Sequence, residues 1–276
     1  MTLEDIGAGL RLCRASQWNQ VEDDWRCFLE LEGGGGRIAE KNGAVAGTVT
    51  YLRYCRAFSW VAMMLVDPAA RRGGIGSQLL AAALDALAEE PCVRLDATPA
   101  GEPLYRRFGF VPEYELSRAK TTVEHERFRG AWHTAARRME SEDFDEVLTR
   151  DREIFGADRS ALLLSFHGRA PELAWTAWDG ALLTGYCFGR PGYRYHQLGP
   201  IVAESSDAAR ALVAGCLATQ DGRSIAVDVP RRPEWVEWLV SAGFEIERPF
   251  LRMRRGENRD IGLPGRQFAI AGPDFA

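Results

Sequence analysis

The sequence has no long apolar run, and the absence of such a run excludes one class of protein at once. No stretch approaches the roughly 18 consecutive apolar residues that a membrane-spanning helix needs, so no membrane partner is expected. The first residues, MTLEDIGAGLRLC, carry two acidic side chains and no apolar core, unlike a secretory signal peptide. We therefore expect a cytoplasmic protein.

Cysteine and histidine are scarce and scattered. The six cysteines form no Cys-x-x-Cys pair, and the four histidines show no His-Glu-x-x-His spacing. Disulfide frameworks and zinc sites both need such grouping, so reduced thiols and no metal are expected. A cysteine acyl-enzyme would use Cys55 or Cys92, but no sequence pattern pairs either with an activating histidine.

Positive charge is not in excess. Lys and Arg total 34 against 39 Asp and Glu, for a net charge of -5. A nucleic-acid binder needs a basic surface, so no nucleic-acid partner is expected. The 276 residues are 46% hydrophobic, enough for a sizeable core. At roughly 150 residues per domain, this length indicates two domains.

Strand and helix patterns alternate through the first half. Asn42-Gly43 is a strong hairpin signal, and the continuous apolar run at 59–67 is typical of a buried strand. After it, apolar residues recur at helical spacing up to Glu89. Further strands are predicted at 10–16, 92–98 and 110–120, and further helices at 17–32 and from 102.

The second half repeats this order. Residues 92–118 and 223–253 share a strand ending in Asp, a Pro-containing loop, a short helix, Gly-Phe and another strand. The pattern predicts an internal duplication with its joint near 133–144, hence domains 1–135 and 136–276. The fold class is α/β, with a mixed sheet flanked by helices in each lobe.

The segment MMLVDPAARRGGIGSQLL carries the most specific chemistry. A strand that runs through glycines into a helix leaves unpaired N–H groups at the positive end of the helix dipole, where a phosphate or diphosphate binds. Glycines let the backbone come close, and Arg71 or Arg72 adds charge. A P-loop would need Gly-Lys-Ser/Thr, and a dinucleotide fingerprint a small residue where Leu79 stands; both are excluded.

Arg71-x-x-Gly74-x-Gly76 after a strand, followed by Tyr105 four residues before Gly109-Phe110, resembles the GNAT superfamily of acyl-CoA N-acyltransferases over roughly residues 10–120. WNQVEDDW, LDATPAG and DREIFGADRS are similar to a bacterial tandem subgroup with an active first domain and a diverged second one. The resemblance implies mainly antiparallel sheets. The second half lacks the Arg-Gly loop and has Leu239 where Tyr105 would align.

The resemblance also implies roles for individual residues. Backbone groups of Met64, Leu65 and Val66 would pair with the pantetheine arm, with an N–H near Met64 polarising the thioester. Tyr105 would protonate the departing thiolate. The diphosphate would lie on the amides of the loop, which are those of Arg71, Arg72, Gly73, Gly74, Ile75, Gly76 and Ser77.

The implied activity is direct transfer of an acetyl group from acetyl-CoA to a primary amine of a small molecule in a ternary complex. The alternative is a non-catalytic acyl-CoA sensor. Asp96 either caps a turn or acts as base or amine anchor, and a homodimer stays open. Four residues form an acidic, aromatic acceptor pocket or are ordinary core and capping residues: Trp18, Asn19, Glu22 and Asp24.

Overall fold

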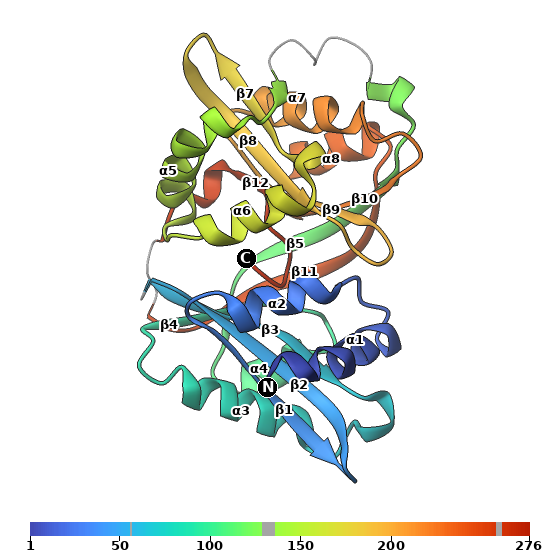
Figure 1. The fold of residues 1–276 in the computed structure, drawn as a ribbon, viewed down its shortest axis with the longest axis vertical. Coiled ribbons are helices and arrows are strands. Elements are labelled where there is room, and N and C mark those ends of the chain that lie inside the picture. Colours follow the sequence, from blue (N-terminus) through green and yellow to red (C-terminus); the bar gives the residue numbers. More distant parts are fainter. Residues whose placement is uncertain (56, 129–135, 258–260) are drawn as a thin grey trace. The chain divides into compact units, whose positions relative to one another are not determined.

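The computed structural model describes residues 1–55, 57–128, 136–257 and 261–276, which form two compact α/β units (Figure 1). The first contains Met1–Glu113 and the described residues of Leu251–Arg259 and Pro273–Ala276. The second contains Tyr114–Phe250 and the described residues of Asp260–Gly272. The predicted division after residue 135 lies at 129–135, outside the described residues. Each unit therefore takes in a segment from the other side of that division.

The first unit has the strand order β1-β2-β3-β4-β11. All neighbours pair antiparallel except β3 and β4, which are parallel. This confirms the predicted mixed, mainly antiparallel fold class. The strands are β1 (Gly34–Lys41), β2 (Ala44–Tyr54), β3 (Phe58–Val66), β4 (Cys92–Ala97) and the part of β11 (Glu245–Gly256) that begins at Leu251. The helices are α1 (Ile6–Ala15), α2 (Glu22–Glu30), α3 (Ile75–Ala86) and α4 (Glu102–Arg107).

Helices cover both faces of this sheet (Figure 1). The apolar residues of α3 pack on the face that carries Val49, Val61 and Val93, and α1 and α2 cover the other. The predicted hairpin is confirmed, with positive φ at Asn42 and Gly43.

The predicted strand at 10–16 is wrong, because this segment lies in α1 and its connection to α2. The buried residues of α1 are Ile6, Gly9, Leu12 and Cys13, which is helical rather than alternating spacing. A Cβ at Gly9 would lie 2.8 Å from the Trp25 ring. The small residue thus lets the two helices pack closely.

The second unit has the order β5-β10-β9-β8-β7-β6, with β12 paired to β9. Its strands are β5 (Val111–Thr122), β6 (Ala136–Arg138), β7 (Trp175–Asp179), β8 (Leu182–Arg190), β9 (His196–Ala203), β10 (Ser224–Pro230) and β12 (Gln267–Ala269). Its helices are α5 (Phe144–Phe155), α6 (Ser160–Arg169), α7 (Ser206–Leu217) and α8 (Pro233–Ser241). Short 3-10 turns lie at Leu3–Asp5, Pro68–Ala70, His125–Phe128, Ser141–Asp143, Pro171–Leu173 and Pro264–Arg266.

In each unit a buried Arg–Asp ion pair joins two neighbouring antiparallel strands, one of which stands at an end of the strand order given above. In the first unit Arg252 on β11 makes two 2.9 Å bonds to Asp96 on β4, directly across the ladder. In the second, Arg118 on β5 makes two 2.8 Å bonds to Asp228 on β10, again directly opposite. Both aspartate side chains are fully buried. The repeat between the two halves therefore includes this Arg–Asp pair, which holds β11 in the first unit and β5 in the second.

In the part of the chain that the structure describes, no helix has both the length and the apolar composition required to span a bilayer. The same residues contain no cluster of three or more His, Cys, Asp and Glu side chains arranged to hold a metal ion.

Candidate functional site

The parallel strands β3 and β4 separate soon after they begin. Their pairing covers Ser59 with Val93 and Trp60 with Arg94. Beyond these pairs the described residues show no further pairing between the two strands, although β3 continues to Val66 and β4 to Ala97. Backbone groups on one edge of β3 thus face a gap in the sheet, a place where an extended ligand can add as a strand.

A β-bulge shapes β3 at this gap. Thr48 pairs with Leu65 but Thr50 pairs with Ala62, so β3 carries one extra residue there. Met63 has φ +45°, a left-handed conformation that costs free energy for a residue with a side chain. The Thr48 hydroxyl donates to the Met63 carbonyl at 2.9 Å within the core. The bulge is held in place by a buried contact.

The ladder alternation decides which residues face the gap. The Asp67 N–H donates to the Ala46 carbonyl, so Asp67 and Leu65 turn their polar backbone groups toward β2. Met64 and Val66 therefore turn theirs toward the gap. Of the three residues predicted to pair with a ligand, Met64 and Val66 turn their backbone groups toward the gap. The backbone of Leu65 is engaged with β2, and its side chain is buried.

The glycine-rich loop of residues 71–77, called the cradle below, leads into α3 beside this gap. Gly74 has φ +82° at the N-cap of α3, a conformation suited to glycine. The first helical bond runs from Gln78 N–H to the Gly74 carbonyl at 3.1 Å, so the N–H groups of Ile75, Gly76 and Ser77 point out of the helix end. A Cβ at Gly76 would lie 3.8 Å from the Met64 side chain. The cradle and β3 therefore adjoin.

The two arginines of the loop are exposed but differ in their contacts. Arg71 donates from Nε to the Val66 carbonyl at 3.2 Å, which ties the loop to the end of β3. Arg72 has φ +65° and extends into solvent beside Gly73 and Gly74. Asp67, at the start of the loop, is paired with Arg11 at 2.8 Å. That hydrogen bond lowers the pKa of Asp67.

Tyr105 lies on α4, on the same face of the sheet as α3. Its side chain is 8% exposed and meets the Phe110 ring edge-on at 6.0 Å. Among the residues with described positions, none bonds to its hydroxyl. Burial raises the pKa of Tyr105 to about 12, so the hydroxyl carries its proton at neutral pH. This is the state that a proton donor needs.

Gly101 is a supporting residue that the sequence did not single out. A Cβ there would lie 2.9 Å from Cε2 of Tyr105. Its N–H also bonds to the Thr98 carbonyl at 2.9 Å, which closes the turn between β4 and α4. Gly101 therefore permits the position of the tyrosine ring.

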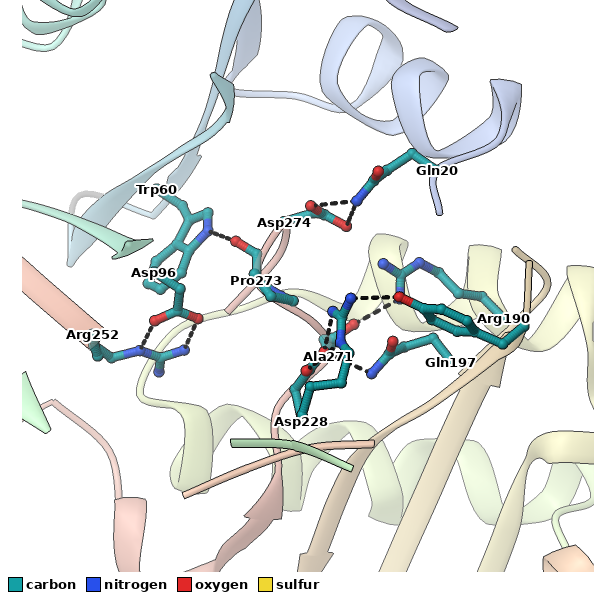
Figure 2. Close-up of polar contacts among 12 residues, drawn as sticks. Gln20, Trp60, Asp96, Arg190, Gln197, Asp228, Arg252, Ala271, Pro273 and Asp274 are labelled. Atoms are coloured by element: carbon teal, nitrogen blue, oxygen red, sulfur yellow. Dashed lines mark hydrogen bonds and ion pairs between the residues drawn. The ribbon is translucent and has the colours of Figure 1, made fainter. Parts of the chain in front are cut away.

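Asp96 does not fit the predicted role of base or amine anchor. Its carboxylate is fully buried and bound twice by Arg252, whose guanidinium lies 4.6 Å over the Trp60 ring (Figure 2). Taking up a proton would leave that buried guanidinium without its counter-charge. The structure gives Asp96 the task of holding β11.

The predicted acidic acceptor pocket is also corrected. Asp24 is buried and accepts the Val21 N–H at 3.0 Å, so it caps α2. Glu22 is exposed and pairs with Arg26 at 2.8 Å on the same helix. Trp18 and Asn19 are half-buried in the connection before α2. The carboxylates therefore have the helix-end roles that the sequence left as the alternative, and a role for Trp18 and Asn19 beside an acceptor stays a prediction.

A buried polar contact that sequence reasoning missed lies next to them. Gln20 donates to both carboxylate oxygens of Asp274, at 2.9 and 2.8 Å, and the Trp60 indole donates to the Pro273 carbonyl at 3.0 Å (Figure 2). Phe275 stacks on Phe28 at 4.9 Å. The segment Pro273–Ala276 is thus a core element of the first unit. No local pattern could link positions 254 residues apart.

Within the described residues of the second unit, the helix that corresponds to α3 begins without a glycine-rich loop. At the start of α7 the Ser205 side chain accepts the Ala208 N–H, so a polar side chain caps the helix end that is glycine-rich in the first unit. Leu239, in the position that aligns with Tyr105, is fully buried. As far as the structure describes the two units, only the first combines the cradle with a tyrosine at this position.

Comparison with known proteins gives related matches for both halves. Models of the acetyltransferase (GNAT) domain match residues 27–112 and 147–267. A holothin acyltransferase of Pseudoalteromonas sp. (strain SANK 73390) is 28% identical over 251 residues, covering 88% of this chain and 82% of that protein. The uncharacterized N-acetyltransferase YitH of Bacillus subtilis (strain 168) is 24% identical, covering 90% and 88%.

Solved structures show the same fold over the whole chain. A putative acetyltransferase from Pyrococcus horikoshii superposes with a TM-score of 0.82 at 20% identity, covering 100% of this chain and 94% of that one. A tandem GNAT protein from the clavulanic acid biosynthesis pathway gives 0.67 at 14% identity, covering 94% and 98%.

Proposed function

The chain belongs to the GNAT superfamily and is an acyltransferase, and from that premise we propose that it transfers an acetyl group from acetyl-CoA to a primary amine of a small molecule. The observation that carries the proposal is the gap between β3 and β4. It lies beside the exposed amides at the start of α3. A Cβ at Gly76 there would lie 3.8 Å from Val66 of β3 and 3.5 Å from Leu104 of α4, the helix that carries Tyr105.

The residues present fit coenzyme A. Its diphosphate needs N–H donors and close backbone approach, which the amides of Ile75, Gly76 and Ser77 and the open backbone of Gly73 offer. Its pantetheine arm carries amides that would pair with the backbone of Met64 and with the N–H of Val66, whose carbonyl already accepts a bond from Arg71. Bound acetyl-CoA would supply the activated acyl thioester.

This chain's own groups would do the rest. A backbone N–H at the bulge would donate to the oxygen that gains charge during attack, a contact worth a few kcal/mol in comparable sites. Tyr105, held protonated by burial, would give a proton to the leaving thiolate. With both substrates bound side by side, the amine nitrogen would bond to the acyl carbon, the carbon–sulfur bond would break, and water would take the proton that the amine loses. Positioning would supply much of the acceleration. Tyr105 favours this enzyme over a non-catalytic sensor, which needs no proton donor.

The test is release of free thiol from acetyl-CoA across a panel of amines. The panel comprises amino acids, polyamines, amino sugars, lysine peptides and holothin, the last because one relative is a holothin acyltransferase. Thiol release that depends on an amine, with the acetylated amine identified by mass, is the expected result. Tight coenzyme binding without turnover on any amine would instead favour the sensor.

A charge placed in the cradle should weaken coenzyme binding without harming the fold. Gly73 is exposed, has no positive φ, and a Cβ there would meet only the Ala70 carbonyl at 3.5 Å. In Gly73→Asp the new carboxylate would repel the diphosphate, and we expect about 30-fold weaker binding of coenzyme A, or ~2 kcal/mol. Isothermal titration calorimetry measures the affinity.

Two controls separate charge from shape. Gly73→Asn has nearly the same size and no charge, so it should bind coenzyme A almost as the unmodified protein does. An acidic residue before a helix is favourable for the helix dipole, so Gly73→Asp should unfold at an unchanged or slightly higher temperature. Unchanged affinity in Gly73→Asp would show that the diphosphate does not lie on this loop, and equal loss in both variants would assign the effect to side-chain volume instead of charge.

A further inference from the structure

The second unit repeats the gap of the first, and the chain fills it with its own backbone. Strands β9 and β10 are parallel and pair only at His196 with Ile225 and Gln197 with Ala226. In the first unit the parallel pairs are Ser59 with Val93 and Trp60 with Arg94. In both units the two strands pair at two positions and then separate.

The β-bulge is repeated as well. Leu198 pairs with Gly189 and Ile201 with Cys187, so β9 carries one extra residue at Gly199-Pro200. Counted from the first parallel pair, Pro200 stands where Met63 stands on β3. The duplicated strand has therefore kept the distortion that shapes the gap.

The segment that fills the second gap is Gln267–Ala271, called the inserted segment below. Gln267 pairs with Val202 and Ala269 with Ile201 on β9, and the Ile270 N–H donates to the Asp228 carbonyl on β10 at 2.9 Å. Ile201 stands five residues after His196, as Met64 stands five residues after Ser59. The inserted segment lies against the positions of β9 that match Met64 and Leu65.

The inserted segment is built in rather than loosely laid over. Ala269, Ile270 and Ala271 are fully buried. The Arg190 guanidinium donates to the Ala271 carbonyl at 2.8 Å (Figure 2), and the Trp235 indole donates to the Phe268 carbonyl at 3.0 Å.

Gly199 provides room for this approach. A Cβ there would lie 2.0 Å from the Ile270 carbonyl oxygen, and the corresponding residue on β3 is Ala62. The second gap thus accepts a backbone where the first has a side chain.

We infer that the inserted segment occupies the gap between β9 and β10, called the groove of the second unit below. In the first unit, the proposed function assigns the corresponding gap to the pantetheine arm. The inference rests on that function for the identity of the ligand. The second unit is then a coenzyme-free unit whose groove takes a strand of the same chain, and each chain binds one coenzyme. The missing cradle at α7 and the filled groove are two independent observations that agree.

The experiment counts coenzyme sites on the full chain by calorimetry with acetyl-CoA and coenzyme A. We expect one equivalent, which Gly73→Asp weakens without exposing a second. A second equivalent, or binding that Gly73→Asp leaves at full affinity, would overturn the inference. No binding of either ligand would contradict the proposed function instead, and the groove is then judged by the next measurement alone.

That measurement is hydrogen exchange of the Ile270 amide in the free protein. A strand built into the core should exchange as slowly as β9 itself, and Gly199→Ala should speed exchange at Ile270 by about 10-fold or more because its Cβ displaces the segment. Gly168→Ala on α6, where a Cβ meets nothing within 4 Å, is the matched control and should change nothing. Fast exchange at Ile270 in the unmodified protein would refute the built-in strand.

Discussion

Arg252→Ala is expected to lower the free energy of unfolding by about 3–5 kcal/mol, because removing one partner of a buried ion pair leaves the other charge uncompensated. The Asp96 carboxylate is fully buried, and Arg252 is its bidentate partner. The variant also loses the stacking of the guanidinium on Trp60. Denaturant unfolding followed by circular dichroism measures the change.

Two comparisons test the cause. Asp96→Leu combined with Arg252→Met removes both charges and keeps apolar volume, so it should recover most of the lost stability. Arg26→Ala breaks an exposed pair on α2 and should leave the unfolding midpoint almost unchanged. If the double variant were as unstable as Arg252→Ala, packing rather than the unpaired charge would be the cause.

Tyr105→Phe is expected to reduce kcat by about 100-fold or more, the usual contribution of a positioned general acid. Phenylalanine keeps the edge contact with Phe110 and the space beside Gly101, so the fold and the affinity for coenzyme A should not change. Steady-state kinetics with the best amine of the panel, together with calorimetry of coenzyme binding, measure the two effects. An unchanged kcat would leave Tyr105 as a pocket wall only.

The pH profile gives a second readout of the same residue. The pKa of Tyr105 is raised to about 12 by burial, so its proton is present at all lower pH values and is lost only as the pH rises through about 12. Between pH 6 and 10 Tyr105 should therefore add no alkaline decline to kcat. Any decline in that range that disappears in Tyr105→Phe would contradict the raised pKa.

The sequence predicted the local features of the first unit well. Glycines at φ values that favour them, such as Gly43 and Gly74, mark turns that need no tertiary information. The apolar period of α3 marks its buried face in the same way. The strand predicted at 10–16 was wrong because Leu10 and Leu12 satisfy a period of two, whereas the burial of Gly9 against Trp25 is visible only once both helices are packed.

The site was harder to predict wherever a side chain's partner lies far away in sequence. Asp96 ends a strand, and the sequence left it as either a turn cap or a base or amine anchor. Its observed partner, Arg252, lies 156 residues away and could not be predicted from local sequence. The sequence left Asp24 as either a pocket carboxylate or a capping residue, and the structure shows the local alternative: at the third position of the helix it caps the helix end. The prediction took Met64, Leu65 and Val66 together, whereas successive residues of a strand turn their backbone groups to opposite edges, and the pairing with β2 engages Leu65.

Residues 251–256 of β11 and Pro273–Ala276 belong to the first unit, and this affects how the chain folds during its synthesis. The ribosome synthesises Met1–Glu113 long before Arg252 or Asp274. Until β11 is synthesised, β4 lacks this neighbouring strand. The first unit cannot finish folding in the order of translation, and closing it requires contacts across 156 and 254 residues that are slow to form. Until then the edge of β4 is exposed to other chains. A nascent chain stalled before residue 251 should therefore bind chaperones through its first half.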